Sequence, residues 1–256
     1  MKMPSLFLPH GAPDLPLSGH PAAKFLQQLK RNIPNPKAIV IISAHWETFG
    51  VQITTAPELE TIYDFGGFPS ELYDLKYAAK TTPELIEKIK NLLGDANIQF
   101  SANNRRGLDH GAWVPLWLAF PDANIPIVQL SLDRRMNAED LFKFGQVLGV
   151  LREQNILIIG SGASVHNLGN ITPEGSPVAD WAIAFNGWLE GVIENNEWQK
   201  LLKFSAVPHY KQAHPTPEHL LPLIVAAGAG LDEPTSKIHS SFSYGSIGMS
   251  AWMFGD

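Results

Sequence analysis

The chain contains no cysteine among its 256 residues, and this absence excludes several kinds of chemistry at once. Disulfides, thiolate zinc sites and cysteine nucleophiles are ruled out, and the composition fits a reducing compartment. Charge is also sparse, because only 17% of residues are charged and the formal net charge is −6, without a cluster of Lys and Arg. We therefore expect no nucleic-acid partner, and any recognition of an anion has to be local.

Long apolar runs are missing as well. A bilayer span needs about twenty consecutive apolar residues, and no such run occurs. Residues 1–9 carry too short an apolar run for a signal peptide. We therefore expect a cytoplasmic protein with no membrane partner. No internal repeat or linker is apparent, so residues 1–256 are predicted to form a single catalytic domain; the oligomeric state, a homodimer included, is left open.

Short apolar runs that alternate with helical patterns make up most of the chain. Residues 38–42 and 155–159 are mostly β-branched or leucine, which is typical of strands buried on both faces, as in a parallel sheet. Residues 51–55 alternate weakly and predict an edge strand. Helical patterns are found at residues 21–31, 83–93, 137–152 and 177–194. These patterns predict an α/β fold, with a central, mostly parallel or mixed sheet flanked by helices.

Histidines stand just beyond three of the expected strands. His10, His45 and His166 each follow an apolar run, and His219 falls in the first turn of a buried helix expected to begin near Thr216. Ligands of open α/β sheets bind beyond the carboxyl ends of the strands. A single such histidine could simply bond to backbone, but three at one edge indicate a mononuclear metal site. Imidazole ligands suit iron or zinc.

Acidic residues and two further motifs lie near these histidines in the sequence. Glu47, Glu218 and Asp109 could be ligands or could support the ligands. Gly160-Ser-Gly162 resembles a phosphate loop, but neither the dinucleotide fingerprint nor the Walker sequence is completed. Ser164 beside His166 could form a nucleophile–base pair, although no acid that would orient it is in view.

Residues 62–73 combine two glycines and a proline with four aromatic side chains, so they predict an irregular loop rather than a helix or strand. Two interpretations are open for this aromatic loop: it packs onto the core, or it forms one wall of a pocket.

Six motifs in a fixed order give the chain a resemblance to a known family. They are Leu8-Pro-His-Gly-Ala-Pro13, Ser43-Ala-His-Trp46, Tyr63-Asp-Phe-Gly-Gly-Phe-Pro69, Leu108-Asp-His-Gly-Ala-Trp113, Gly160-Ser-Gly-Ala-Ser-Val-His-Asn-Leu168 and Pro215-Thr-Pro-Glu-His219. Together they resemble the DOPA-type class III extradiol ring-cleavage dioxygenases, relatives of the catalytic subunit of protocatechuate 4,5-dioxygenase. The resemblance extends from near residue 5 to residue 250.

The resemblance implies a role for each motif histidine. His10, His45 and His219 would bind the metal, and His166 would be the catalytic acid/base or, in zinc-loaded resting members, a fourth ligand. His110 would contact substrate or bound oxygen. Since a flat substrate ring needs apolar faces, the aromatic loop then favours a pocket wall, with Tyr63, Phe65 and Phe68 binding substrate. The remaining four histidines are predicted to be surface or loop residues: His20, His209, His214 and His239.

The implied activity is that of a non-haem Fe(II)-dependent extradiol dioxygenase. Such an enzyme opens the ring of a catechol, for example DOPA or a related catecholic acid, with O2 and gives a muconic semialdehyde-type product. Two alternatives remain open: a zinc-binding, hydrolase-like enzyme, since three histidines bind Zn(II) at least as tightly as Fe(II), and a non-catalytic metal-binding relative. The sequence does not identify partners for the carboxylate or amine of a DOPA-like substrate; Arg105 and Arg106 lie near Asp109 but are typical solvated loop residues.

Overall fold

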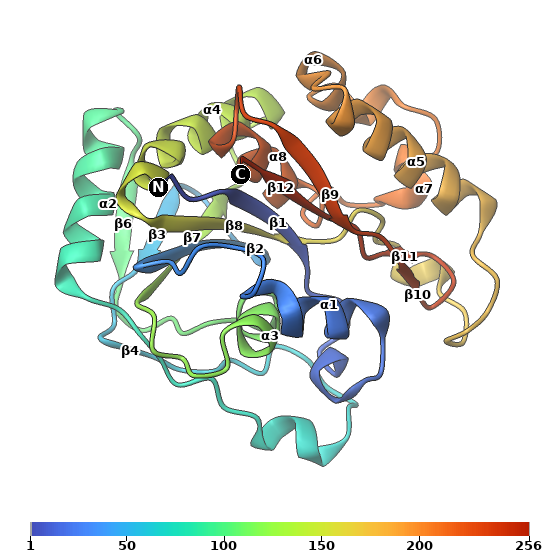
Figure 1. Cartoon of the computed structure of the whole chain (residues 1–256), viewed down its shortest axis with the longest axis horizontal. Helices are drawn as coiled ribbons and strands as arrows, with labels where there is room; N and C mark the ends of the chain where they lie inside the picture. The colour runs from blue at the N-terminus through green and yellow to red at the C-terminus, as the bar shows by residue number, and fades with distance from the viewer. Residues whose placement is uncertain (1, 256) are drawn as a thin grey trace.

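A computed structural model describes residues 2–255 and contains an eight-stranded sheet between two layers of helices (Figure 1). The sheet order is β6-β3-β7-β2-β8-β1-β12-β9. Its strands are β1 (Ser5–Pro9), β2 (Ala38–Thr48), β3 (Val51–Thr54), β6 (Phe100–Asn103), β7 (Ile127–Asp133), β8 (Ile156–Gly162), β9 (Thr235–His239) and β12 (Ala251–Phe254). Two small sheets pair β4 (Glu58–Leu59) with β5 (Ala79–Lys80) and β10 (Phe242–Ser243) with β11 (Ile247–Gly248).

The sheet is parallel in its centre and has antiparallel pairs on both sides of it, because β3 is antiparallel to β7 and parallel to β6. Strands β7, β2, β8 and β1 run parallel, whereas β12 is antiparallel to both β1 and β9. The predicted α/β class with a mixed sheet is thereby confirmed. The expectation that residues 51–55 form an edge strand is wrong, because β3 lies between β6 and β7. Its alternation is weak because Val51, Ile53 and Thr54 are all buried.

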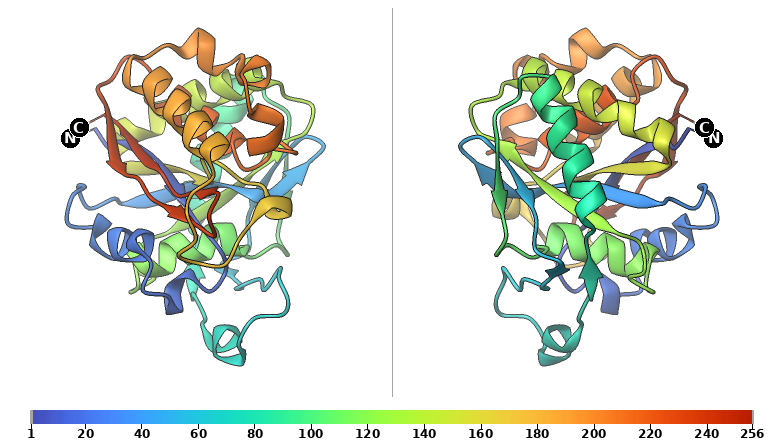
Figure 2. Two further views of the ribbon diagram at one scale, coloured as in Figure 1. Left: turned by 90° about the vertical axis from the view of Figure 1, so that its right-hand side faces the viewer. Right: turned by 90° about the vertical axis from the view of Figure 1, so that its left-hand side faces the viewer.

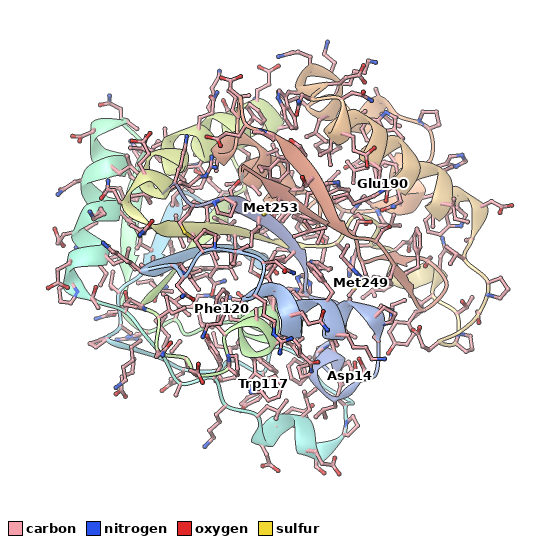
Figure 3. All side chains as sticks on the ribbon, viewed as in Figure 1. Asp14, Trp117, Phe120, Glu190, Met249 and Met253 are labelled. Carbon is pink, nitrogen blue, oxygen red and sulfur yellow. The ribbon has the colours of Figure 1, made fainter. Side chains whose placement is uncertain are left out.

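Helices cover both faces of the sheet (Figures 1 and 2). One face carries α2 (Pro83–Asp95), α4 (Ala138–Gly149), α5 (Asp180–Glu194) and α8 (Leu221–Ala229), and the other carries α1 (Pro21–Leu29) and α3 (His110–Ala119). Side chains fill the space between the layers (Figure 3). Within residues 2–255, no helix is long and apolar enough to cross a bilayer.

Strand β2 contributes to both cores. Val40 and Ile42 pack in the core beneath α4 and α8, whereas Ile39 and Ile41 pack in the core beneath α1 and α3. All four are fully buried, and each such side chain stabilises the fold by roughly 1.5–3 kcal/mol. Because β2 packs against a core on each face, its residues have to be apolar without interruption. This packing anchors the strand that carries His45.

The helix expected to begin near Thr216 begins later. Helix α8 starts at Leu221, and residues 215–220 form turns, so His219 precedes the helix and the predicted first-turn position is wrong. The start at Leu221 places Pro222 in the first turn, where its missing N–H leaves no helical hydrogen bond unmade.

Glycines of β8 allow the start of α8 to approach the sheet closely. A Cβ atom on Gly160 would lie 2.1 Å from the carbonyl oxygen of Pro222, and one on Gly162 would lie 2.1 Å from that of His219. The resemblance of Gly160-Ser-Gly162 to a phosphate loop therefore has a packing explanation. The amide of Ala163 also donates to the His219 carbonyl, at 3.0 Å, which fixes the turn that presents this histidine.

Candidate active site and metal centre

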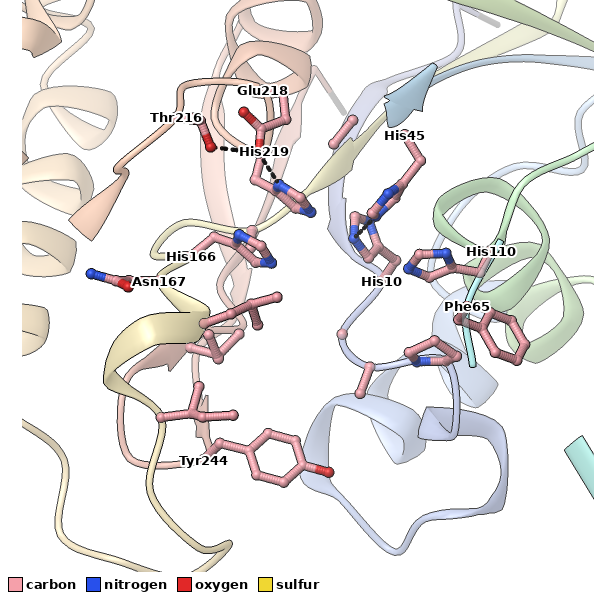
Figure 4. A pocket seen from close by; sticks show the side chains of 18 of the residues that line it. His10, His45, Phe65, His110, His166, Asn167, Thr216, Glu218, His219 and Tyr244 are labelled. Carbon is pink, nitrogen blue, oxygen red and sulfur yellow. Dashed lines mark hydrogen bonds and ion pairs between the residues drawn. The ribbon is translucent and has the colours of Figure 1, made fainter. Parts of the chain in front are cut away.

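Five histidines surround one pocket at the carboxyl ends of the central strands (Figure 4). His10 follows β1, His110 begins α3, His166 follows β8, and His219 lies in the turn before α8. His45 differs from expectation, because β2 continues through it to Thr48 with a register shift between Ile42 and Glu47. The pocket has a volume of about 1180 Å³.

The protonation of His10 follows from its hydrogen bonds. Its Nδ1 lies 3.1 Å from the Ser161 hydroxyl, and that hydroxyl donates its only proton to the Gly111 carbonyl. Ser161 can therefore only accept from His10, so Nδ1 carries the proton and Nε2 presents a lone pair. This Nε2 lies 3.1 Å from Nε2 of His45. Two nitrogens bound to one metal at about 2.1 Å stand about 3 Å apart, so this spacing suits a shared ion.

His219 presents the same atom to the pocket. Its Nδ1 lies 3.0 Å from the carboxylate of Glu218, which also accepts the Thr216 hydroxyl at 3.0 Å. Its Nε2 is buried and has no hydrogen-bond partner within residues 2–255. A carboxylate on the far nitrogen is the usual support of a metal-binding histidine. The unpartnered Nε2 is thus suited to a metal ion.

Asp64 holds His110 in place, a role that the sequence did not predict. Its carboxylate accepts from the His110 backbone amide at 3.0 Å and from the ring Nδ1 at 2.9 Å. Burial raises the pKa of the Asp64 carboxyl, but the bonds from His110 outweigh burial and leave the pKa below its ordinary value. Asp64 falls within the Tyr63-Asp-Phe motif, but the prediction for this motif concerned only its aromatic residues.

Asp109 links the elements that carry His45 and His110. It is fully buried and caps α3 by accepting from the Ala112 amide. Its carboxylate also accepts from Ser43 at 2.6 Å, Gln129 at 2.6 Å and Arg106 at 2.9 Å. Since Ser43 lies on β2 two residues before His45, this buried charge fixes the strand against the helix.

Burial lowers the pKa values of four site histidines, His10, His45, His166 and His219. It lowers the pKa of His45 to about 4, with the nearby His110 adding to the effect, and burial lowers that of His166 to about 4. Burial, followed by repulsion from neighbouring histidines, holds the pKa values of His10 and His219 well below the ordinary value. These four rings are therefore neutral at pH 7, which is the form that binds metal or accepts a proton.

The stacking of two rings separates His166 from the candidate metal ligands. The ring centroids of His10, His45 and His219 are 4.9, 4.9 and 5.3 Å apart, so the three surround one point. His166 instead stacks on His219 at 3.4 Å with an interplanar angle of 7°. A metal in the plane of His219 lies well outside the plane of His166, so both rings cannot bind one ion in this arrangement. By the spacing of their ligand atoms, however, His110 groups with His10 and His45, whereas His219 groups with His166 and Glu218.

The aromatic loop contributes only part of what was expected. Phe65 and Phe68 line the pocket. Tyr63 is not among the pocket-lining residues in the described part of the chain. Its hydroxyl donates to the Leu75 carbonyl at 2.8 Å, and its ring packs against Trp113. The loop is therefore both packed onto the core and part of the pocket wall.

His214 lies in the loop after the short helix α7 (Tyr210–Ala213), as the prediction of a surface or loop residue allowed, but it is not at the surface. Its side chain is fully buried, and Nε2 bonds to the Ser164 carbonyl at 3.0 Å. Burial lowers its pKa to about 4. Its ring contacts Phe185 of α5. The sequence lacks an apolar pattern around this residue, so its burial depends on tertiary packing.

The fold and the site geometry agree with comparisons to known proteins. A family model described as the catalytic LigB subunit of aromatic ring-opening dioxygenase matches residues 6–255. The chain is 40% identical to 4,5-DOPA dioxygenase extradiol of Beta vulgaris, over 98% of this chain and 96% of that protein. It is 37% identical to the protein of that name from Escherichia coli K12, over 97% of this chain and 93% of that protein.

A solved structure is also similar over nearly the whole chain. An uncharacterized protein from Escherichia coli K12 gives a TM-score of 0.84 at 33% identity, covering 99% of this chain and 100% of that one. The family model and these relatives confirm the predicted membership in the extradiol ring-cleavage dioxygenases. With its histidines gathered at the strand ends, the chain belongs to the family of the catalytic LigB subunit and is an aromatic ring-opening dioxygenase.

Proposed function

We propose that this protein is a non-haem Fe(II)-dependent extradiol dioxygenase that opens the ring of a catechol such as DOPA. The observation that carries the proposal is the set of nitrogens turned into one pocket. Nε2 of His10 and Nε2 of His45 face each other at 3.1 Å, and the buried Nε2 of His219 lacks a protein partner. The names of the relatives support the extradiol reaction and the DOPA-like substrate.

In this proposal His10, His45 and His219 hold the ion. When bound, Fe(II) supplies the redox link through which the electron density of a catecholate reaches dioxygen. Three protein ligands leave coordination positions open for both substrates. Ser161 and Glu218 keep the protons of His10 and His219 on Nδ1, so their Nε2 lone pairs stay available.

His166 takes the phenolic proton. The ring lines the pocket and makes no hydrogen bond to another side chain or to backbone carbonyls within residues 2–255. Because burial lowers its pKa to about 4, it is a neutral base at pH 7. His110 faces the substrate from the other side, and the Asp64 carboxylate fixes its orientation through Nδ1. Phe65 and Phe68 provide apolar contact for the ring.

Anaerobic reconstitution tests the proposal. The purified chain is loaded with Fe(II) or, in a parallel sample, with Zn(II), and is then given DOPA, caffeate or protocatechuate in air-saturated buffer. We expect O2 uptake and a yellow semialdehyde with at least one catechol in the iron sample alone. Absence of uptake with every catechol would contradict the dioxygenase proposal, and equal O2 uptake in the iron and zinc samples would contradict the role of Fe(II).

A further inference from the structure

One side chain gives the pocket its permanent positive charge. Among the lining residues in the described part of the chain, Arg134 is the single Arg or Lys. The protein carries a formal net charge of −6, so no global field gathers anions. A local guanidinium in the pocket is therefore suited to orient an anionic group of a substrate, because its planar fork matches a carboxylate.

Arg134 is paired with Glu47, which also lines the pocket. The guanidinium lies 3.2 Å from the Glu47 carboxylate, with side-chain exposures of 52% and 25%. An ion pair this exposed contributes little stability, so a ligand bearing both charges can replace it with two new pairs. The other pocket carboxylates are already engaged, Asp64 with His110 and Glu218 with His219.

The backbone places this pair at a defined distance from the candidate metal ligands. Glu47 lies two residues beyond His45 on β2, and both side chains line the pocket. Two residues of strand span about 6.6 Å. Arg134 follows β7 beside them, and its amide donates to the Thr48 carbonyl at 2.9 Å. A ring held at the histidines would therefore direct a short side chain towards the pair.

We infer that Arg134 and Glu47 form a subsite for the zwitterionic head group of a catecholic amino acid. Arg134 pairs with the α-carboxylate and Glu47 with the α-ammonium group. This inference rests on the proposed function and adds to it the recognition of the tail, for which the sequence showed no partner. The neighbouring Arg135 has no share in it, because its guanidinium is engaged by Asp133 at 2.8 Å.

Four catechols separate the two charges of the tail: DOPA carries both, dopamine the ammonium group, 3,4-dihydroxyphenylpropionate the carboxylate, and 4-methylcatechol neither. Steady-state O2 uptake by the Fe(II)-loaded enzyme gives kcat and KM for each. We expect Arg134→Gln to raise KM about tenfold for the two carboxylate-bearing catechols only. Glu47→Gln should raise KM similarly for the two ammonium-bearing catechols only. Changes in kcat should be small, because these contacts do not touch the reacting ring.

Two exposed residues outside the pocket provide matched controls, Arg105→Gln and Glu58→Gln, and neither should change any of the four KM values. Equal changes for all four catechols, or none, would overturn the subsite. A carboxylate effect without an ammonium effect would overturn the zwitterion assignment. If the wild-type enzyme oxidises none of the four catechols, the proposed function itself has failed. If it oxidises them but neither variant changes any KM, only the subsite has failed.

Discussion

The two sides of the pocket are built differently. The strand wall comprises His10, His45 and His110, which lie at the end of β1, on β2 and at the start of α3. The loop wall comprises His166, which lies in the loop after β8, and His219, which lies in the turn between α7 and α8. Figure 4 shows both side chains. On the strand wall, Ser161 and Asp64 hold the rings of His10 and His110 by hydrogen bonds, whereas on the loop wall the ring of His166 is held chiefly by stacking.

The proposed roles follow how each ring is held rather than the wall on which it lies. A metal ligand has to hold one nitrogen in place, and the hydrogen bonds of His10 to Ser161 and of His219 to Glu218 do so. A group that moves a proton needs a ring whose nitrogens are not committed to the protein. His166 meets that need, and the following variants test whether the hydrogen-bonded rings bind the metal while the ring of His166 moves the proton.

The largest effect is expected from removing a metal ligand on either wall. His45→Ala on the strand wall and His219→Ala on the loop wall should each reduce bound iron to background and abolish O2 uptake, because two remaining imidazoles bind the ion weakly. Metal content per chain after gel filtration measures this. His209→Asn, at an exposed position with φ 65°, should retain metal. Full metal content in His219→Ala would show that His110 is the third ligand.

The next largest effect is expected from removing the proposed acid/base, His166. His166→Ala should keep its metal and lose about 10²- to 10⁴-fold in kcat, since a positioned proton acceptor contributes that much. Metal content and single-turnover kinetics on the same preparation separate binding from chemistry. A parallel loss of iron would assign His166 to the coordination sphere and reject its role as the base.

The two supporting carboxylates should differ in what they affect. Glu218→Gln should weaken metal affinity about 10- to 100-fold, because Glu218 orients a ligand through Nδ1. Asp64→Asn should chiefly lower kcat, because the carboxylate orients His110, and should weaken metal affinity less than Glu218→Gln does, because Asp64 lies 3.9 Å from Nδ1 of His45 without a hydrogen bond to it. Competition with a chelator measures affinity, and O2 uptake at saturating iron measures kcat. The reverse pattern would exchange the roles of His110 and His219.

The smallest effect concerns stability at acid pH. Burial lowers the pKa of His214 to about 4 from 6.5, so protons bind the unfolded state preferentially as pH falls from 6.5 towards 4, and stability is lost in that window. His214→Phe should reduce this loss by about 1 kcal/mol at pH 5.5. Urea unfolding of the metal-free protein at pH 7.5 and 5.5 measures the difference. A pH dependence in His214→Phe equal to that of the wild type would contradict the lowered pKa of His214. The control is His209→Asn, at an exposed position.

The sequence predicted the strand wall better than the loop wall. Apolar runs identify buried strands because every residue of β2 from 38 to 42 faces one of two cores. His10 could therefore be placed at the end of a strand. The start of α8 was misplaced because Thr216 and Pro217 form a good local capping signal, whereas close packing against Gly160 and Gly162 shifts the helix to Leu221.

Supporting residues were the hardest to predict. Asp64, Ser161 and Arg134 act on partners far away in the sequence, so no local pattern marks them. Tyr63 was predicted to bind substrate because aromatic residues suit a flat ring, but its hydroxyl bonds to the Leu75 carbonyl. Composition and periodicity report burial and conformation along the chain, and they do not report which buried groups meet across the sheet.

The sequence by itself determined the α/β class, the buried central strands and the set of histidines from which a metal site is drawn. Those features depend on local periodicity and on residue chemistry, which are properties of the chain alone. Only the tertiary structure decided which nitrogen of His10 and His219 faces the pocket and that His166 stacks on His219. It also joined Arg134 to Glu47. These features depend on hydrogen bonds and packing between distant segments, which form only when the strands and loops are assembled.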